Sequence, residues 1–207
     1  MNKVAGLLLA AGTSSRMGRP KQLIPVGGSS LLDRVLAETL RSDLDLVVLV
    51  LGYKAQEIRK GLKADLHHPK LTIVVNTHYG NGISSSILCG LRRIENDYDH
   101  MMTILGDMPF ITSDLINLLL RQYLVSGLPL GAIKTKKGKS HPVIIGRRFY
   151  PDVHQLQGDV GARDLFARFP EDLCLVDPGE TYQEMDIDTP EDYAQIKRSW
   201  PALPSEE

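Results

Sequence analysis

The sequence predicts an α/β fold in which helices cover both faces of a mostly parallel sheet. Strand-like and helix-like segments alternate along nearly the whole chain, as they do in successive strand–helix–strand units. The strand-like segments are short, continuous apolar runs, as expected of strands buried on both faces. The chain has 207 residues, of which 43% are hydrophobic, so it is long enough for one such domain and short for two.

In the first half of the chain, apolar runs predict strands at residues 4–9, 46–51, 71–75 and 101–105. Apolar residues at helical spacing predict a helix that Ser29 or Ser30 caps and that runs to about residue 40. Further helices are predicted at residues 54–62 and 82–94.

In the second half, Thr112 is suited to cap a helix that runs to about residue 125. Strands are predicted at residues 130–134, 142–145 and 173–176, and Pro142 predicts a sheet edge or a strand start. Residues 159–169 and 190–198 are predicted to be helical, and Thr189 followed by Pro190 is a typical helix start. We expect residues 1–200 to form one domain and residues 201–207 to form a disordered tail.

Composition excludes several classes of function. The formal net charge is −1, so no bulk attraction to nucleic acid or to an anionic membrane is expected. Cys89 and Cys174 lack the spacing of a metal site or of a disulfide framework. No apolar run approaches the ~18 residues that a membrane span needs, and no signal peptide is recognisable at residues 1–3. We therefore expect a cytoplasmic protein.

A loop of small residues follows the first predicted strand. It contains Gly12 and Gly18, and the cations Arg16 and Lys21 lie within nine residues after Gly12. Small residues leave backbone N–H groups unobstructed, and clustered N–H groups bind anions. The two cations would add full charges on phosphate oxygens. The loop therefore indicates a triphosphate site, although a glycine-rich turn that binds nothing is the simpler alternative. The spacings of a P-loop and of a dinucleotide-binding fingerprint are both absent.

Two acidic segments are candidates for a metal site. Asp107 comes just after a buried strand, and a carboxylate there suits Mg²⁺. A capping role for Asp107 is less favoured because Thr112 already serves the next helix. Asp186 and Asp188 precede the last helix, and strand alternation would point both to one face. Taken alone, this second cluster fits a helix start and a metal site equally well.

Three further segments carry weaker signals. His141 opens a predicted strand, and the basic residues 134–139 before it fit either a solvated hairpin tip or a surface that receives an anionic second substrate. Capping explains one of the serines 84–86 and not all three, so the helix start after Gly82 is a candidate for reading a base or holding phosphate. Residues 158–163 form another tight entry to a helix.

Taken in order, these motifs resemble the molybdenum cofactor cytidylyltransferase family. The resemblance runs from residue 4 to about residue 196. The loop at residues 9–21 and the segment 106–109 are shared with the wider nucleotidyltransferase superfamily. The segments 141–143, 158–163 and 186–190 narrow the similarity to the molybdenum cofactor branch.

The resemblance implies a Rossmann-like three-layer α/β/α nucleotidyltransferase fold and assigns roles to individual residues. Arg16, Lys21 and Asp107 would be catalytic, Asp107 and Asp188 would hold Mg²⁺, and the segment around His141 would face the acceptor. The residues that would bind the nucleotide are Leu9, Ala10, Ala11, Gly12, Arg16, Lys21, Gly82, Ser86 and Asp107. Ala10-Ala11-Gly12 is similar to the branch that uses CTP rather than GTP.

The implied reaction transfers CMP from CTP to the terminal phosphate of molybdopterin or the molybdenum cofactor and releases pyrophosphate. A client molybdoenzyme is an implied partner, and neither nucleic acid nor a membrane is. Two alternatives stay open. One is a nucleotidyltransferase for a sugar phosphate or methylerythritol phosphate. The other is a non-catalytic nucleotide-binding module that handles the cofactor.

Overall fold

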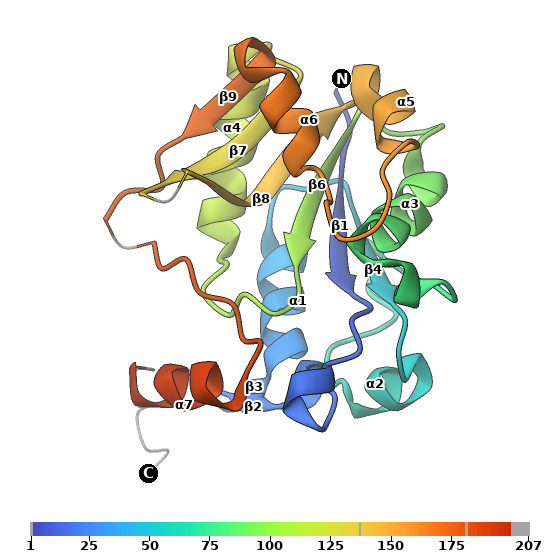
Figure 1. Ribbon diagram of the computed structural model, residues 1–207, viewed down its shortest axis with the longest axis vertical. Coiled ribbons are helices and arrows are strands. Elements are labelled where there is room, and N and C mark those ends of the chain that lie inside the picture. The colour runs from blue at the N-terminus through green and yellow to red at the C-terminus, as the bar shows by residue number, and fades with distance from the viewer. Residues whose placement is uncertain (1, 137, 181, 200–207) are drawn as a thin grey trace.

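A seven-stranded sheet forms the centre of the molecule (Figure 1). The computed structural model describes residues 2–136, 138–180 and 182–199. The strands lie in the order β5-β4-β1-β6-β8-β7-β9, and only β8 runs antiparallel to its neighbours. Their bounds are β1 Val4–Ala10, β4 Leu46–Leu51, β5 Leu71–Val75, β6 His100–Leu105, β7 Leu130–Thr135, β8 Gly138–Gly146 and β9 Leu173–Val176. The prediction of a mostly parallel sheet is confirmed.

Helices cover both faces of the sheet and complete three layers, as expected. Helices α1 (Leu31–Arg41), α2 (Ala55–Gly61) and α4 (Ser113–Ser126) contribute to the core on one face. Helices α3 (Ile83–Ile94), α5 (Tyr150–Val153) and α6 (Arg163–Arg168) contribute to the core on the other. Within β1, Leu8 faces the first core while Leu7 and Leu9 face the second, so alternation buries the strand on both sides.

Capping side chains fix the helix starts that the sequence predicts. The Ser30 Oγ accepts a hydrogen bond from the Asp33 N–H at 3.1 Å, and the Thr112 Oγ1 accepts one from the Leu115 N–H at 3.2 Å. Both caps satisfy a backbone donor that the helix itself leaves unpaired. Because Thr112 caps α4, Asp107 is not needed for that role.

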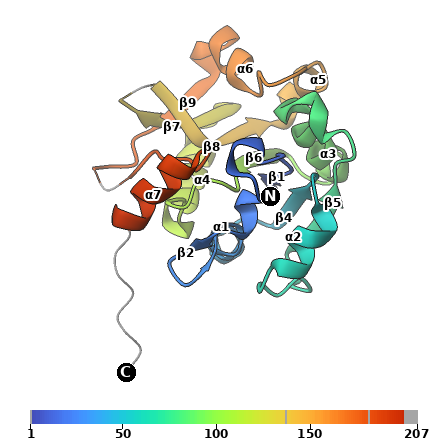
Figure 2. The ribbon, with the colours of Figure 1, turned by 60° about the horizontal axis from the view of Figure 1, so that its bottom comes forward.

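The last helix belongs to a small third core. Helix α7 (Pro190–Ser199) lies beside the two-stranded hairpin of β2 (Pro25–Val26) and β3 (Ser29–Ser30), as Figures 1 and 2 show. Ile196 of α7 packs there with Ile24 and Ile187. In both views the loop after β1 lies between α7 and α2. This third core therefore brings the C-terminal part of the chain to the end of β1.

The prediction for Pro142 is wrong, because β8 begins four residues earlier, at Gly138, and lies inside the sheet between β6 and β7. The register against β7 shifts, since Ala132 faces Val143 whereas Ile133 faces Ser140. His141 and Pro142 therefore occupy a bulge, where the missing N–H of proline costs no ladder hydrogen bond.

Two other predicted segments differ from what the structure shows. Helix α6 spans Arg163–Arg168 rather than residues 159–169, because Gly158 and Gly161 have positive φ values of 62° and 58° and form turns first. Residues 182–189 form no strand, so the argument that alternation points Asp186 and Asp188 to one face is wrong. The predicted tail at residues 201–207 lies outside the described residues. No described helix is both long and apolar enough to cross a membrane.

Candidate functional site

Three distant segments of the predicted site, which carry Lys21, Asp107 and Asp188, meet at the C-terminal ends of β1 and β6. These two strands pair in parallel, with Leu9 opposite Leu105, so the loops that follow them are neighbours. Asp107 lies in the loop after β6, and Lys21 lies in the loop after β1. The third segment reaches the site because the Ile187 N–H donates a hydrogen bond to the Asp107 carbonyl oxygen at 3.0 Å. This bond places Asp188 beside Asp107.

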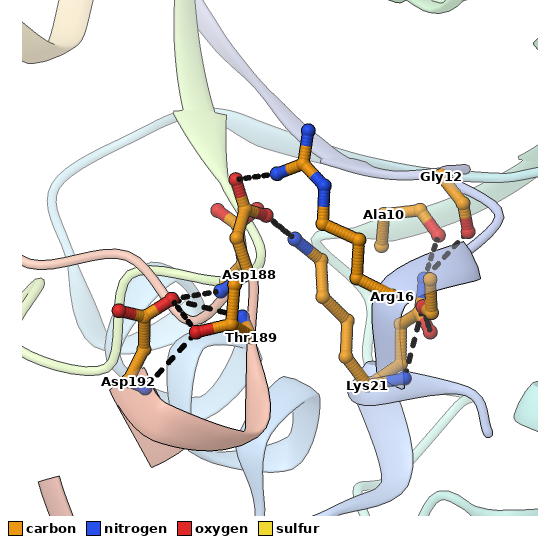
Figure 3. Close-up of polar contacts among 10 residues, drawn as sticks. Ala10, Gly12, Arg16, Lys21, Asp188, Thr189 and Asp192 are labelled. Carbon is orange, nitrogen blue, oxygen red and sulfur yellow. Dashed lines mark hydrogen bonds and ion pairs between the residues drawn. The ribbon is translucent and has the colours of Figure 1, made fainter. Parts of the chain in front are cut away.

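The ammonium of Lys21 lies between the carboxylates of Asp107 and Asp188, and Figure 3 shows it reaching toward Asp188. Its Nζ is 2.6 Å from the Asp107 Oδ2 and 2.7 Å from the Asp188 Oδ1. The Lys21 side chain is only 14% exposed, and burial by itself opposes its charge. The two carboxylates outweigh burial and raise the pKa of Lys21 above its ordinary value. Arg16 is 3.7 Å from the Asp188 Oδ2, with 71% of its side chain exposed.

The loop after β1 is braced by Gln22, a residue that the sequence analysis did not single out. The Gln22 Nε2 donates to the carbonyl oxygens of Ala10 at 3.0 Å and Gly12 at 3.2 Å. The Gln22 Oε1 accepts from the Ser14 hydroxyl at 3.3 Å, and the Ser14 Oγ accepts from the Lys21 N–H at 3.0 Å. The only signal in the sequence was a neutral polar residue between Lys21 and an apolar pair, and a sequence does not reveal that such a side chain is buried.

This brace turns the loop so that it presents donors. A trans peptide points its C=O and N–H in opposite directions, so a Gly12 carbonyl held by Gln22 turns the Thr13 N–H away from it. In the part of the chain that the structure describes, no hydrogen bond uses the N–H of Gly12 or Thr13. A Cβ added at Gly12 would meet no atom within 4 Å. The loop therefore has the open, donor-rich form of an anion site.

Two adjoining cavities open at this end of the sheet. The first, of about 370 Å³, is lined by all the predicted nucleotide-binding residues except Arg16. Those residues are Leu9, Ala10, Ala11, Gly12, Lys21, Gly82, Ser86 and Asp107. The second, of about 580 Å³, is lined by His141, Lys139 and Arg163. Ile83, Leu105 and Asp159 line both cavities. The predicted acceptor residue thus lies next to the predicted nucleotide residues.

His141 is held in one orientation. Its Nδ1 is 3.3 Å from the Thr103 carbonyl oxygen, which can only accept a hydrogen bond, so Nδ1 carries the proton. Burial lowers the pKa of His141 below its ordinary value. The imidazole is therefore a polar, uncharged part of the second cavity at neutral pH.

The helix start after Gly82 is already occupied. The N–H groups of Ile83 and Ser84 donate to the Asp159 Oδ1 at 3.2 Å and to the Gly158 carbonyl oxygen at 3.1 Å. These two N–H groups are therefore not free to hold a phosphate, as the prediction for this helix start would require. The Ser86 hydroxyl accepts from the Asn76 side chain at 3.1 Å and still lines the first cavity. Its contact with a nucleotide stays a prediction.

The carboxylates fit a hard divalent cation. The Asp107 Oδ1 is buried and has no hydrogen-bond partner, while the Asp107 Oδ2 and the Asp188 Oδ1 already meet at one cation, the Lys21 ammonium. Mg²⁺ commonly takes one or two carboxylates and completes its shell with water and substrate phosphates. Among the described residues no group of three or more His, Cys, Asp or Glu side chains is placed to hold a metal.

The structure also distinguishes the surroundings of Asp186 from those of Asp188, which the sequence alone did not do. Only Asp188 touches Lys21, whereas Asp186 lines the second cavity. Burial raises the pKa of Asp186, and the negative charges of Asp107 and Asp188 add to the effect. Asp188, rather than Asp186, is therefore the carboxylate that lies with Asp107 around the Lys21 ammonium.

This fold is the fold of the nucleotidyltransferases. Residues 6–173 match the family model described as the MobA-like NTP transferase domain, and the chain belongs to that family. The predicted family resemblance and fold are confirmed.

The chain is 31% identical to nicotine blue oxidoreductase of Paenarthrobacter nicotinovorans, over 91% of this chain and 93% of that protein. It is 30% identical to purine catabolism protein PucB of Bacillus subtilis, over 94% and 96%. It is 24% identical to the molybdenum cofactor cytidylyltransferase of Escherichia coli, over 97% and 98%. These names describe different activities, so family membership does not fix the reaction.

Solved structures show the same fold. The homologue of Mycobacterium tuberculosis Rv0371c from Mycobacterium sp. strain JC1 matches with a TM-score of 0.81 and 28% identity, over 95% of this chain and 96% of that one. Rv0371c itself, in a complex with manganese, matches with a TM-score of 0.79 and 22% identity, over 96% and 100%.

Proposed function

We propose that this protein transfers CMP from CTP to the terminal phosphate of molybdopterin or the molybdenum cofactor and releases pyrophosphate. One observation carries the proposal: Lys21, Asp107 and Asp188 converge beside a loop with open N–H groups, and Lys21 and Asp107 line the first of two adjoining cavities. The first cavity would hold the nucleotide and the second the acceptor. The similarity to the Escherichia coli cytidylyltransferase along nearly the whole chain supports this acceptor.

In the proposed reaction an oxygen of the acceptor phosphate forms a bond to the α-phosphorus of CTP. The bond from that phosphorus to the β-phosphate oxygen breaks, and pyrophosphate leaves in line. The attacking phosphate is already an anion, so no strong general base is needed. Catalysis then consists mainly of positioning and charge stabilisation.

The chain's own groups supply both effects. The N–H groups of Gly12 and Thr13 would bind phosphate oxygens, and the Lys21 ammonium, which donates to Asp107 and Asp188 in the substrate-free protein, has three N–H groups to offer them. Lys21 would steady the attacking and α-phosphates, and the exposed Arg16 would hold the departing β- and γ-phosphates. Asp107 and Asp188 would hold Mg²⁺, which supplies positive charge to phosphate oxygens when it is bound. Manganese in the complex of a structural relative supports a divalent-metal site in this fold.

The second cavity suits an acceptor that is partly flat and apolar and partly anionic. Ile83, Val143 and Phe166 provide apolar walls, and Lys139 and Arg163 provide positive charge beside the carboxyl groups of Asp159, Glu184 and Asp186. His141 adds one neutral hydrogen-bonding group to this wall. A pterin that carries a phosphate combines these properties.

The test is a panel of nucleotides and acceptors. The purified protein is incubated with α-labelled CTP, GTP or UTP and with molybdopterin, methylerythritol phosphate or a sugar 1-phosphate. Pyrophosphate and the labelled product are measured. We expect CTP with molybdopterin to give the largest kcat/KM. A clear preference for another acceptor would assign the protein to a different nucleotidyltransferase reaction. Nucleotide binding without turnover of any acceptor would indicate the non-catalytic module.

Asp107→Asn tests the carboxylate assignment. We expect kcat to fall by about two orders of magnitude or more, because a contact made to the transition state is lost. The circular dichroism spectrum should stay unchanged. Asp114→Asn, an exposed carboxylate in the first turn of α4, is the matched control and should keep its activity. Near-normal pyrophosphate release by Asp107→Asn would remove Asp107 from the mechanism.

A further inference from the structure

The Lys21 ammonium occupies the space between the two carboxylates proposed to hold the metal. Its Nζ lies 2.6 and 2.7 Å from the oxygens of Asp107 and Asp188, so those two oxygens are no farther apart than the sum of these distances. Lys21 is mostly buried, and Arg16 is 3.7 Å from Asp188 on the solvent side. The substrate-free protein therefore already neutralises much of this negative charge with its own cation.

We propose that Lys21 is a placeholder cation: it closes the metal position in the substrate-free protein and opens it when a nucleotide draws the ammonium onto its phosphates. This inference rests on the proposed function, because it requires Asp107 and Asp188 to be the metal ligands. It adds that metal and nucleotide bind cooperatively, and that Lys21 is the residue that couples them.

Competition follows from size and charge. Mg²⁺ requires its oxygen ligands at about 2.0–2.1 Å. A divalent ion and an ammonium cannot both lie between the same two oxygens without strong repulsion, so the metal must displace Lys21. The Asp107 Oδ1, which is buried and has no partner, would remain available to the incoming ion.

The contacts of Lys21 fix its backbone but leave its side-chain ammonium able to move. Its backbone N–H is fixed by the Ser14 hydroxyl at 3.0 Å, and the next residue, Gln22, is 3% exposed and fixed by bonds to Ala10 and Gly12. The four-carbon side chain is flexible and ends in a compact charge. The same side chain lines the first cavity, where the open N–H groups of the loop would hold the phosphates. A nucleotide bound there offers Lys21 new anionic partners within reach of a fixed pivot.

The placeholder proposal predicts the opposite of what removing a site residue usually does, which is to weaken binding. Without Lys21, the two carboxylates should bind a divalent ion more tightly in the absence of nucleotide. The coupling between metal and nucleotide should also weaken, and because coupling is reciprocal, it should weaken in both directions.

The experiment measures Mn²⁺ binding from the electron paramagnetic resonance signal of the free ion, with and without CTP. The proteins are wild type, Lys21→Met, Asp107→Asn and the double variant Lys21→Met/Asp107→Asn. Lys54→Met is the matched control, because Lys54 forms an exposed ion pair with Glu57 at 3.1 Å and its replacement changes the net charge equally. CTP also binds Mn²⁺ in solution, but that contribution is the same for every protein and cancels in the comparison.

We expect Lys21→Met to bind Mn²⁺ at least about tenfold more tightly than wild type without CTP, since a full positive charge within about 4 Å is removed. CTP should then improve Mn²⁺ affinity by a smaller factor than in wild type. The melting temperature of Lys21→Met should rise on adding Mn²⁺, which shows that the variant folds and binds. Lys54→Met should behave as wild type.

Different results would contradict the placeholder role of Lys21 and the assignment of Asp107 and Asp188 as metal ligands. If Lys21→Met binds Mn²⁺ no more tightly than wild type while Asp107→Asn still abolishes binding, the placeholder is wrong and the metal site stands. If the double variant binds Mn²⁺ as tightly as Lys21→Met, or if no protein binds Mn²⁺ with or without CTP, the metal assignment in the proposed function is wrong.

Discussion

At the scale of single residues, Gln22 illustrates how a side chain behind the site can determine the shape of the loop. Its amide satisfies two carbonyl oxygens and one hydroxyl in a nearly dry environment, at 3% exposure. Replacing it would remove the buried hydrogen bond to the Ala10 carbonyl and the half-buried one to Gly12, and a buried unsatisfied group costs about 1–3 kcal/mol. The orientation of the loop N–H groups depends on the same bonds.

Gln22→Ala should therefore lower the free energy of unfolding by about 2–3 kcal/mol and weaken nucleotide binding by at least about tenfold. Urea unfolding and isothermal titration with CTP measure the two effects. Gln56→Ala, in the exposed part of α2, is the control and should change neither. Full CTP affinity in Gln22→Ala would show that the loop keeps its shape without the brace.

His100 gives a pH-dependent prediction far from the site. Its Nδ1 donates to the Tyr123 hydroxyl at 2.9 Å, because that hydroxyl donates to the Pro129 carbonyl oxygen at 3.3 Å. Its Nε2 is buried without a partner, and burial lowers the pKa of His100 although Asp99 opposes the shift. Below its ordinary pKa of about 6.5, the unfolded state thus binds more protons than the folded state, and stability falls as pH falls.

We expect the free energy of unfolding to decrease from pH 7.5 to pH 5.5, with His100 contributing at most about 1.4 kcal/mol per pH unit. The His100→Asn variant, which keeps a donor for Tyr123, should show a smaller decrease. Urea titrations at both pH values measure the difference. A ring-proton NMR titration that places the His100 midpoint above 6.5 would contradict the argument.

At the scale of elements, the features that the sequence predicted correctly are local. Ser30 and Thr112 cap their helices through hydrogen bonds to residues three positions further along the chain, so a short stretch of sequence includes both partners of each bond. The bulge at Pro142 depends on which strands flank β8, and no local pattern contains that information. The same holds for residues 158–162, whose turns depend on contacts with α3, 74 positions away.

The start of α7 connects an element to the site. The Asp192 Oδ2 accepts from the N–H groups of Asp188 at 3.1 Å and Thr189 at 2.8 Å, and the Thr189 Oγ1 accepts from the Asp192 N–H at 3.2 Å (Figure 3). This reciprocal cap fixes the backbone that carries Asp188. The sequence predicted the helix start, but not that the cap also positions a proposed metal ligand.

Asp192→Ala should cost about 1 kcal/mol of stability, as the loss of a helix cap does, and should also weaken Mn²⁺ binding in the presence of CTP. Hydrogen exchange should accelerate at residues 187–193. Glu191→Ala, the neighbouring acid of the same turn, is the control and should keep the metal affinity. An unchanged affinity in Asp192→Ala would mean that Ile187 alone positions Asp188.

At the scale of the whole molecule, the sequence predicted which residues lie near one another at the candidate site but not which side chains contact each other there. Parallel strands place the loops after β1 and β6 side by side, so the proximity of Lys21 and Asp107 follows from the fold. The direct contact of Lys21 with both carboxylates does not follow from the fold, because it depends on a third segment that the hydrophobic packing of α7 brings in. The sequence motifs indicated the candidate site, and tertiary packing determined its electrostatics.

The wall between the two cavities is likewise made by distant parts of the chain. Gly82, before α3, has φ of +87° and ψ of 176°, a conformation that essentially only glycine adopts. A Cβ at this position would lie 2.3 Å from the carbonyl carbon of Gly158. The Asp159 side chain, which bonds to the Ile83 N–H, lines both cavities. Gly82 therefore allows the segment at Gly158 to close against α3 and separate the two cavities.

Gly82→Ala should lower the free energy of unfolding by about 3 kcal/mol or more, because backbone strain and a backbone clash add. Gly80→Ala is the matched control: a Cβ there meets no atom within 4 Å, so its stability should change by less than about 1 kcal/mol. Asp159→Ala tests the side-chain contact by itself, because it removes the bond to the Ile83 N–H without strain or a clash at Gly82. It should leave Gly82 undisturbed, cost only about 1 kcal/mol and accelerate hydrogen exchange at residues 157–162 and at the start of α3. If Gly82→Ala were as stable as Gly80→Ala, with slow exchange at residues 157–162, the close approach of these two segments would not be what holds the wall together.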